Sequence, residues 1–251
     1  MCTPTVSVIM PCYNAANYLA DSVESVIAQT FRDWELLIIN DCSRDNSMEI
    51  AESYAAKDKR IRLLHTDSPS GSATVPRNIG IREAKGRYIA FLDADDQWLP
   101  EKLEQQLPLF DAPEVAVVFS NYEKMDAEGR RNSRIVKAPA LVTYGKLLQS
   151  NVIGNLTGIY DSEKAGKGQM PNLHHEDYAF WLSILKQGFV AKNTNTVLAV
   201  YRTAGQSLSG NKLKAMSWTW NIYRNQEKLP LPAACYYFLH YAVRSGLKFL
   251  K

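Results

Sequence analysis

Three carboxylates stand close together directly after a short apolar run in the first hundred residues. The run Tyr88–Leu92 is followed by Asp93, Asp95 and Asp96. Like charges this close raise one another's pKa, so a partner of opposite charge stabilises them. Carboxylate oxygens suit Mg²⁺ or Mn²⁺, which keep several waters and share their ligands with substrate phosphates. A solvated turn is the alternative interpretation, because Asp is common in turns.

A second acidic pair, Glu176-Asp177, stands where the apolar pattern predicts a helix over 177–186. A carboxylate there can act as a general base that removes a proton from an attacking hydroxyl group. Acidic residues also favour the first turn of a helix, because the helix dipole stabilises negative charge there. The residues alone therefore support a catalytic role and a structural role equally. We expect the neighbouring His174 and His175 to be solvated or to support the site, because adjacent residues rarely chelate one ion; contact of one of them with the metal or the diphosphate is the alternative.

The elements that must position these acids alternate along the chain. Short apolar runs predict strands at 6–10, 34–39, 61–64, 88–92 and 115–119. Helical spacing predicts helices near 19–27, 47–56, 76–85 and 99–110. This alternation predicts the α/β class, with a Rossmann-like, mostly parallel central sheet that carries helices on both faces.

Ligands of such a sheet bind beyond the carboxyl ends of its strands, so residues that follow three of the strands should meet at one crevice. These residues are Pro11–Asn14, Asn40–Ser43 and Asp93–Asp96. There Tyr13 can stack on a nucleobase, Asp41 can accept a hydrogen bond from the base, and Arg77 can meet a base carbonyl or a phosphate. Each has a structural alternative: Tyr13 can belong to the core, Asp41 to a turn, and Arg77 to the surface of a helix.

Several chemistries lack their motifs in this chain of 251 residues. No P-loop, no G-x-G-x-x-G after the first strand and no G-x-S-x-G elbow occurs. The net charge of +3 is too balanced for a dedicated nucleic-acid binder, so we expect no nucleic-acid partner. The four scattered cysteines form no C-x-x-C pair, which fits a reducing compartment, and no secretory signal is expected.

Five segments in order resemble the family 2 inverting glycosyltransferases of GT-A fold, over about Thr5 to Tyr201. They are Val6–Asn14, Leu37–Ser43, Pro76–Ile81, Gly86–Asp96 and Glu176-Asp177. The resemblance implies a nucleotide-sugar donor, most often a UDP-sugar, and a divalent cation, Mn²⁺ or Mg²⁺. A nucleotidyltransferase is one alternative, although the Gly-rich basic loop of that class is missing after the first strand. A non-catalytic nucleotide-sugar-binding protein is the other.

The resemblance also implies a role for individual residues. The residues implied to bind the nucleotide-sugar are Pro11, Tyr13, Asn14, Asp41, Arg77, Asp93, Ala94, Asp95, Arg202 and Ser207. Asp95 is implied to be the direct metal ligand with Asp93 beside it, while Asp96 supports the turn. Asp177 is implied to be the catalytic base, and Glu176 positions the acceptor or the base.

The chain divides by character into three parts. We expect residues 1–204 to form the GT-A catalytic domain, with a nucleotide-sugar-binding half at 1–105 and an acceptor-binding half at 106–204. Residues 205–251 should form a basic, aromatic helical tail, because the stretch from Arg202 to Lys251 has eight basic residues and one acid.

The tail has two interpretations. Within 233–251 a polar stripe of His240, Arg244, Lys248 and Lys251 lies on an otherwise apolar helix, which suits an anionic membrane surface. The helix can instead dock on the catalytic domain or on a second subunit in a homodimer. We expect a cytoplasmic protein, with peripheral membrane contact under the first interpretation, that transfers one sugar per encounter to a saccharide or lipid-linked saccharide of a surface polysaccharide.

Overall fold

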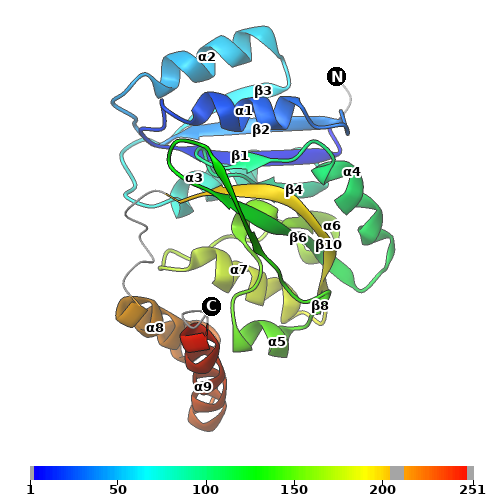
Figure 1. Ribbon diagram of the computed structural model, residues 1–251, viewed down its shortest axis with the longest axis vertical. Helices are drawn as coiled ribbons and strands as arrows, with labels where there is room; N and C mark the ends of the chain where they lie inside the picture. Colours follow the sequence, from blue (N-terminus) through cyan, green and yellow to red (C-terminus); the bar gives the residue numbers. More distant parts are fainter. Residues whose placement is uncertain (1–2, 204–211, 248–251) are drawn as a thin grey trace.

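A mixed β-sheet forms the centre of the molecule (Figure 1). The structure is a computed structural model that describes residues 3–203 and 212–247. In these residues the strands follow the spatial order β3-β2-β1-β4-β9-β6-β10-β5, while β7 pairs with β6 and β8 with β10. The strands are β1 Val6–Cys12, β2 Trp34–Asn40, β3 Ile61–His65, β4 Tyr88–Phe91, β5 Gln97–Trp98, β6 Val115–Met125, β7 Arg131–Val136, β8 Leu141–Val142, β9 Ile159–Asp161 and β10 Val190–Arg202.

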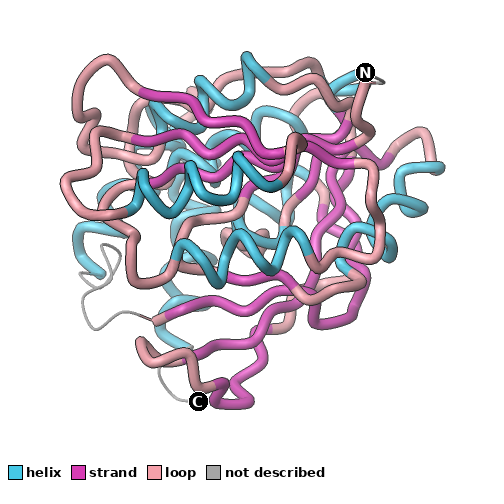
Figure 2. Tube along the Cα trace, turned by 90° about the horizontal axis from the view of Figure 1, so that it is seen from above, coloured by secondary structure: helices cyan, strands magenta, loops and turns pink. Residues whose placement is uncertain are grey.

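Helices cover both faces of this sheet (Figures 1 and 2). They are α1 Leu19–Ile27, α2 Ser47–Lys57, α3 Thr74–Glu83, α4 Lys102–Gln106, α5 Tyr144–Gln149, α6 Ser162–Ala165, α7 Glu176–Leu185, α8 Lys212–Asn221 and α9 Leu231–Leu247. Shorter pieces are η1 Leu107–Asp111, η2 Asn155–Thr157 and the π-helical η4 Ile222–Gln226. Alternate side chains of the central strands enter two cores, one shared with α1, α2 and α4, the other with α3, α5 and α7. The predicted α/β architecture is confirmed.

The parallel half of the sheet contains β3, β2, β1 and β4. The sequence predicted a strand that ends at residue 10, before Pro11. In the structure β1 continues through Pro11 to Cys12. The reason is the register: β1 pairs with β4 only as far as Ile9, so at Pro11 only β2 lies alongside. A proline is tolerated where no neighbour needs its missing N–H group.

Two predicted helices also differ from the structure. α3 begins at Thr74 rather than at Pro76, and a proline is compatible with the first turn of a helix. The helix predicted over 99–110 is a short α4 followed by the 3-10 helix η1. Pro108 lies in η1 and has no N–H group for an α-helical hydrogen bond, which explains the change.

The other half of the sheet is more irregular. The short strand β9, which the sequence did not predict, runs antiparallel between β4 and β6. β6 extends beyond the predicted 115–119 to Met125, and it pairs in parallel with β10. After residue 212 the chain forms α8, η4 and α9, which lie together at the lower end of the molecule (Figure 1). No helix within the described residues is long and apolar enough to cross a membrane.

Candidate active site

Three strand ends meet at one edge of the sheet, as the parallel pattern predicted. β1 lies between β2 and β4, and Cys12 pairs with Asn40. Just beyond the strands, the backbone N–H of Asp41 donates to the carbonyl of Cys12 at 2.8 Å, and that of Leu92 to Ile9 at 3.0 Å. The loops that carry the predicted site residues therefore start side by side.

Arg77 joins two acids that are far apart in the sequence. Its guanidinium contacts Asp93 Oδ1 at 2.5 Å and Glu176 Oε1 at 2.6 Å. The side chain is buried, and these two carboxylates raise its pKa against the effect of burial. α3 can place Arg77 here because Gly80 lets the helix approach β1: an added Cβ would lie 2.5 Å from Ile9 Cγ2. The acids after β4 and those at the start of α7 thus belong to one site.

The pKa of Asp177 is raised from 3.8 to about 6. Burial is the main cause and the charge of Glu176 adds to it, while Arg77 acts in the opposite direction. Asp177 is the second residue of α7, a helix that begins directly after His175, whose backbone is left-handed with φ 61°. The helix itself is fixed by buried aromatic side chains, among them Trp181. A rigid carboxylate with a pKa near neutrality is suited to accept a proton.

The loop after β4 is held from behind by Arg202. The backbone N–H of Arg202 donates to Asp96 Oδ1 at 2.8 Å, and its Nε donates to the carbonyl of Asp95 at 2.9 Å. Further contacts reach the carbonyl of Ala127 at 3.1 Å and Asp21 at 3.3 Å. Because Arg202 is only 3% exposed, its guanidinium supports the backbone of this loop rather than facing open solvent. Asp96 is buried as well and serves the same turn.

The chemistry of Asp93 and Asp95 fits a divalent cation. Burial and the charge of Asp93 raise the pKa of Asp95 to about 6, and among the described residues Asp95 forms no salt bridge. No cluster of three or more His, Cys, Asp or Glu ligands occurs in residues 3–203 and 212–247. Mg²⁺ and Mn²⁺ need fewer, because waters and substrate phosphates complete their coordination.

Comparison with known proteins identifies the family. The model of "Glycosyl transferase family 2" matches residues 7–168. The putative teichuronic acid biosynthesis glycosyltransferase TuaG of Bacillus subtilis (strain 168) is 42% identical over 240 residues, which are 95% of each chain. This chain belongs to glycosyltransferase family 2. It is therefore an enzyme that transfers sugars, as the five segments predicted.

Other relatives agree with this assignment. WfgD of Escherichia coli, named a UDP-Glc:α-D-GlcNAc-diphosphoundecaprenol β-1,3-glucosyltransferase, is 38% identical over 95% of this chain and 92% of its own. Among solved structures, Staphylococcus aureus TarS 1–349 in complex with UDP-GlcNAc aligns with a TM-score of 0.71, 21% identity and coverage of 88% of this chain and 66% of that one. Mannosyltransferase PcManGT from Pyrobaculum calidifontis, in complex with GDP-Man and Mn²⁺, aligns with a TM-score of 0.72 and 17% identity. The alignment covers 96% of this chain and 69% of that one. These likenesses show the GT-A fold.

On the predicted nucleoside side of this glycosyltransferase, Asp41 is held by the loop after β3. Thr66 Oγ1 donates to it at 2.8 Å and Ser70 Oγ at 2.7 Å. Tyr13 is 56% exposed at the mouth of the site, and Asn14 accepts a hydrogen bond from the N–H of Arg44 at 2.8 Å. The structure therefore brings Asp93, Arg77 and Glu176 into contact and gives Asp41 separate partners.

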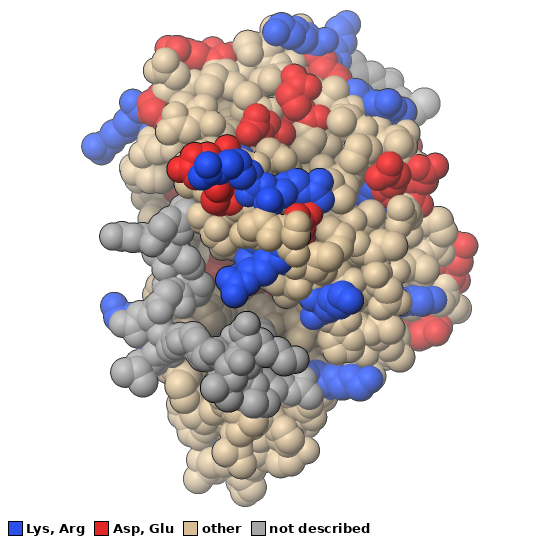
Figure 3. All heavy atoms as spheres, viewed as in Figure 1, with Lys and Arg blue, Asp and Glu red and all other residues tan. Residues whose placement is uncertain are grey.

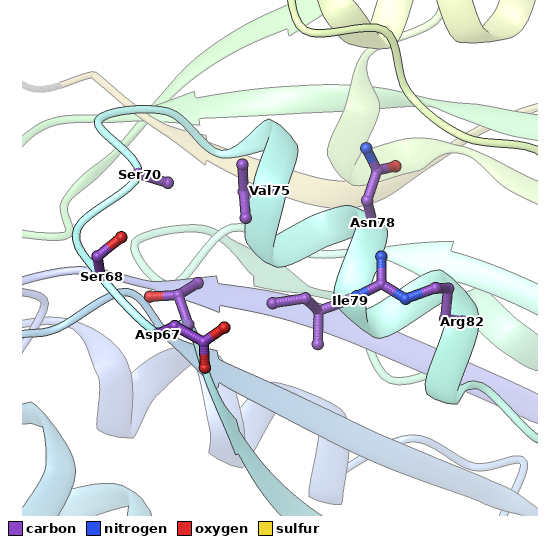
Figure 4. Close-up of a pocket in the computed structure, with 8 residues that line it drawn as sticks. Asp67, Ser68, Ser70, Val75, Asn78, Ile79 and Arg82 are labelled. Carbon is purple, nitrogen blue, oxygen red and sulfur yellow. The ribbon is translucent and has the colours of Figure 1, made fainter.

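A hollow of about 390 Å³ lies beside this loop. Figure 4 shows its wall, in which α3 contributes Val75, Asn78, Ile79 and Arg82 and the loop contributes Asp67, Ser68 and Ser70. Arg77 lies between these α3 positions and contacts the acids instead. The hollow thus adjoins the partners of Asp41 but contains none of the predicted catalytic carboxylates.

Three partners of the site were missed by the sequence analysis. Thr66 and Ser70 hold Asp41, and the only signal for them was the polar loop after the third strand. Trp218 of α8 stacks on His174, with ring centroids 4.1 Å apart, and no local pattern linked these residues. Ser207, implied by the resemblance, lies outside the described residues.

Proposed function

We propose that this glycosyltransferase moves a single sugar, with inversion, from a UDP-sugar to a saccharide acceptor. The observation that carries this proposal is the contact of Arg77 with both Asp93 and Glu176. It joins the loop suited to a sugar diphosphate with the helix that carries a carboxylate suited to accept a proton. Inversion needs one direct displacement, so no nucleophile of the enzyme is required.

In the proposed reaction Asp177 is the base. The acceptor hydroxyl attacks the anomeric carbon from the face opposite the diphosphate, its proton passes to the Asp177 carboxylate, and the bond from the anomeric carbon to the diphosphate oxygen breaks. Glu176 keeps Arg77 in place and positions Asp177 or the acceptor. A divalent cation on Asp95 and Asp93, Mn²⁺ or Mg²⁺, would neutralise the charge of the leaving diphosphate.

The remaining predicted residues divide between the two substrates. In this proposal residues 1–105 bind the donor, with Tyr13 on the base, Asp41 toward its N–H edge, and Pro11, Asn14 and Ala94 along the wall. Residues 106–204 bind the acceptor. Arg202 positions the loop after β4, since its guanidinium donates to the carbonyl of Asp95 there and also to that of Ala127 in the turn after β6.

We infer from the relatives that the acceptor is lipid-linked and belongs to a surface polysaccharide. TuaG is named for teichuronic acid biosynthesis, and WfgD for an acceptor on diphosphoundecaprenol. In this proposal the enzyme works at the cytoplasmic face of the membrane, as a peripheral protein.

Thermal unfolding with a panel of nucleotide-sugars, with and without Mn²⁺, tests the donor and the cation. One UDP-sugar together with Mn²⁺ should stabilise the protein, by ~2.7 kcal/mol at a hundred times its Kd. Asp95→Asn should lose the part that depends on Mn²⁺, while the exposed Asp111→Asn should keep it. Absence of stabilisation by every UDP-sugar would contradict the proposed donor.

Catalysis is tested by transfer of the stabilising sugar to a soluble saccharide acceptor. The anomeric configuration of the product, read by NMR, should be opposite to that of the donor. Binding without any transfer over a broad acceptor panel would favour the non-catalytic alternative.

A further inference from the structure

One side of α9 presents a continuous apolar stripe to solvent. Leu231, Cys235, Leu239 and Val243 follow one another at intervals of four residues, and Tyr236 lies beside them. The exposed fractions are 55% for Leu231, 53% for Tyr236, 66% for Leu239 and 53% for Val243. A contiguous set of this kind on a monomer marks a surface that meets a partner or a membrane.

The opposite side of α9 is already packed. Ala234 is buried, and Phe238 stacks edge-on against Trp220 of α8 with ring centroids 5.2 Å apart. Tyr237 Oη lies close to Gly145 of α5. The helix therefore docks on its own chain through one face. The other face is the apolar stripe, which consists of Leu231, Cys235, Tyr236, Leu239 and Val243.

The segment that leads into α9 is fixed to the catalytic part of the molecule. Glu227, just before the helix, accepts a hydrogen bond from Tyr144 at 2.6 Å and pairs with Lys186 of the segment after α7 at 2.9 Å. In the adjoining α8, Trp218 stacks on His174, two residues before Glu176. A surface that holds the stripe would thereby set the orientation of the start of α7.

Charge distinguishes the partners that this stripe can meet. Residues 228–251 contain four basic residues, Lys228, Arg244, Lys248 and Lys251, and no Asp or Glu. A second copy of the chain would bring the same positive segment against itself, without acids to pair with it. Anionic lipid headgroups would complement it. Of the predicted polar stripe, the side chain of His240 lies within the described part of the chain, while Arg244, Lys248 and Lys251 enter here through their charge in the sequence.

We propose that α9 docks on the surface of an anionic bilayer, with the stripe buried at the boundary between headgroups and acyl chains. In Figure 3 the lowest part of the molecule, where Figure 1 places α9, shows no Asp or Glu outside the area drawn in grey, so no described acid visible there would repel anionic headgroups. The helix of 17 residues lies along the surface, with Tyr236 in the interfacial region that tyrosine prefers. The docking rests on the proposed function only for its purpose, to present the site to a lipid-linked acceptor.

The test is sedimentation of the full chain with vesicles of phosphatidylcholine, with and without phosphatidylglycerol. The protein should bind the mixed vesicles, more weakly at high salt. Leu239→Asn and Val243→Asn should each lower the partition coefficient about tenfold, because each removes an apolar side chain from the layer. Ile135→Asn, a matched change at a side chain that is 49% exposed on β7, should bind as the parent does.

Two further measurements separate the outcomes. Leu239→Asn should keep the melting temperature of the parent and its rate of sugar transfer to a soluble saccharide. A loss of vesicle binding would then come neither from unfolding nor from damage to the active site. Equal binding by parent and both α9 variants would overturn the proposal. So would a stable dimer in sedimentation velocity that Leu239→Asn abolishes, because the stripe would then be a contact between copies.

Discussion

Asp177→Asn should stabilise the fold while it removes activity. The pKa of Asp177 in the folded protein is about 6, against an ordinary value of 3.8. The folded state therefore holds this proton more tightly than the unfolded chain. The protonated carboxyl group of Asp177 therefore stabilises the fold fully below about pH 4, and this stabilisation is lost as the pH rises through about 6. Above that, the ionised carboxylate costs up to about 3 kcal/mol, at about 1.4 kcal/mol per pKa unit.

Urea unfolding of the parent and the variant at two pH values measures this cost. At pH 8 Asp177→Asn should raise the free energy of unfolding by up to about 3 kcal/mol, and at pH 5, where much of the folded carboxyl is protonated, by about half as much. The turnover number should fall by about 10²- to 10⁴-fold, which is the range that a general base contributes.

The matched control is Asp111→Asn, because Asp111 is exposed and follows Phe110, which packs on Tyr88 at the start of β4, the end of the strand away from Asp93. It should change neither quantity. A gain in stability that is equal at both pH values, or a loss at pH 8, would refute the argument that burial raises the pKa of Asp177. Unchanged turnover would remove Asp177 as the base while leaving the fold and the family untouched.

Two further changes test the neighbourhood of the site, and a pair of glycine substitutions tests the packing of the fold. Glu176→Gln removes a charge that raises the pKa of Asp177, so the acid limb of kcat/KM should move below pH 6; an upward shift would contradict this. Arg77→Ala leaves its two carboxylate partners unpaired and should cost about 3–5 kcal/mol in urea unfolding. Gly86→Ala should lower the melting temperature, since its Cβ would lie 2.7 Å from the backbone of β1. The control is Gly145→Ala, whose Cβ would meet only one atom, at 3.6 Å. It should raise the free energy of unfolding by up to about 1 kcal/mol, because alanine favours the helix α5 more than glycine does. A melting temperature as low as that of Gly86→Ala would show that lack of space does not explain the effect at Gly86.

The framework of the site followed from local sequence patterns. Apolar runs and helical spacing are set by neighbouring residues, so they predicted the parallel strands and the helices between them. The edge at which the loops after β1, β2 and β4 meet followed as well, because parallel strands that are adjacent end on the same side. The short β9 was missed, since three residues carry too little pattern.

By itself, the sequence determined the α/β class, the family and the acids able to do the chemistry, because their type and order are written in short segments. The tertiary structure alone decided which charges meet. Arg77, which stays a predicted nucleoside residue, lies between Asp93 and Glu176, and Arg202 holds the backbone at Asp95. The physical reason is distance along the chain: Glu176 is 99 residues from Arg77, and only the packing of α3 and α7 against the same sheet brings their charges within hydrogen-bonding range.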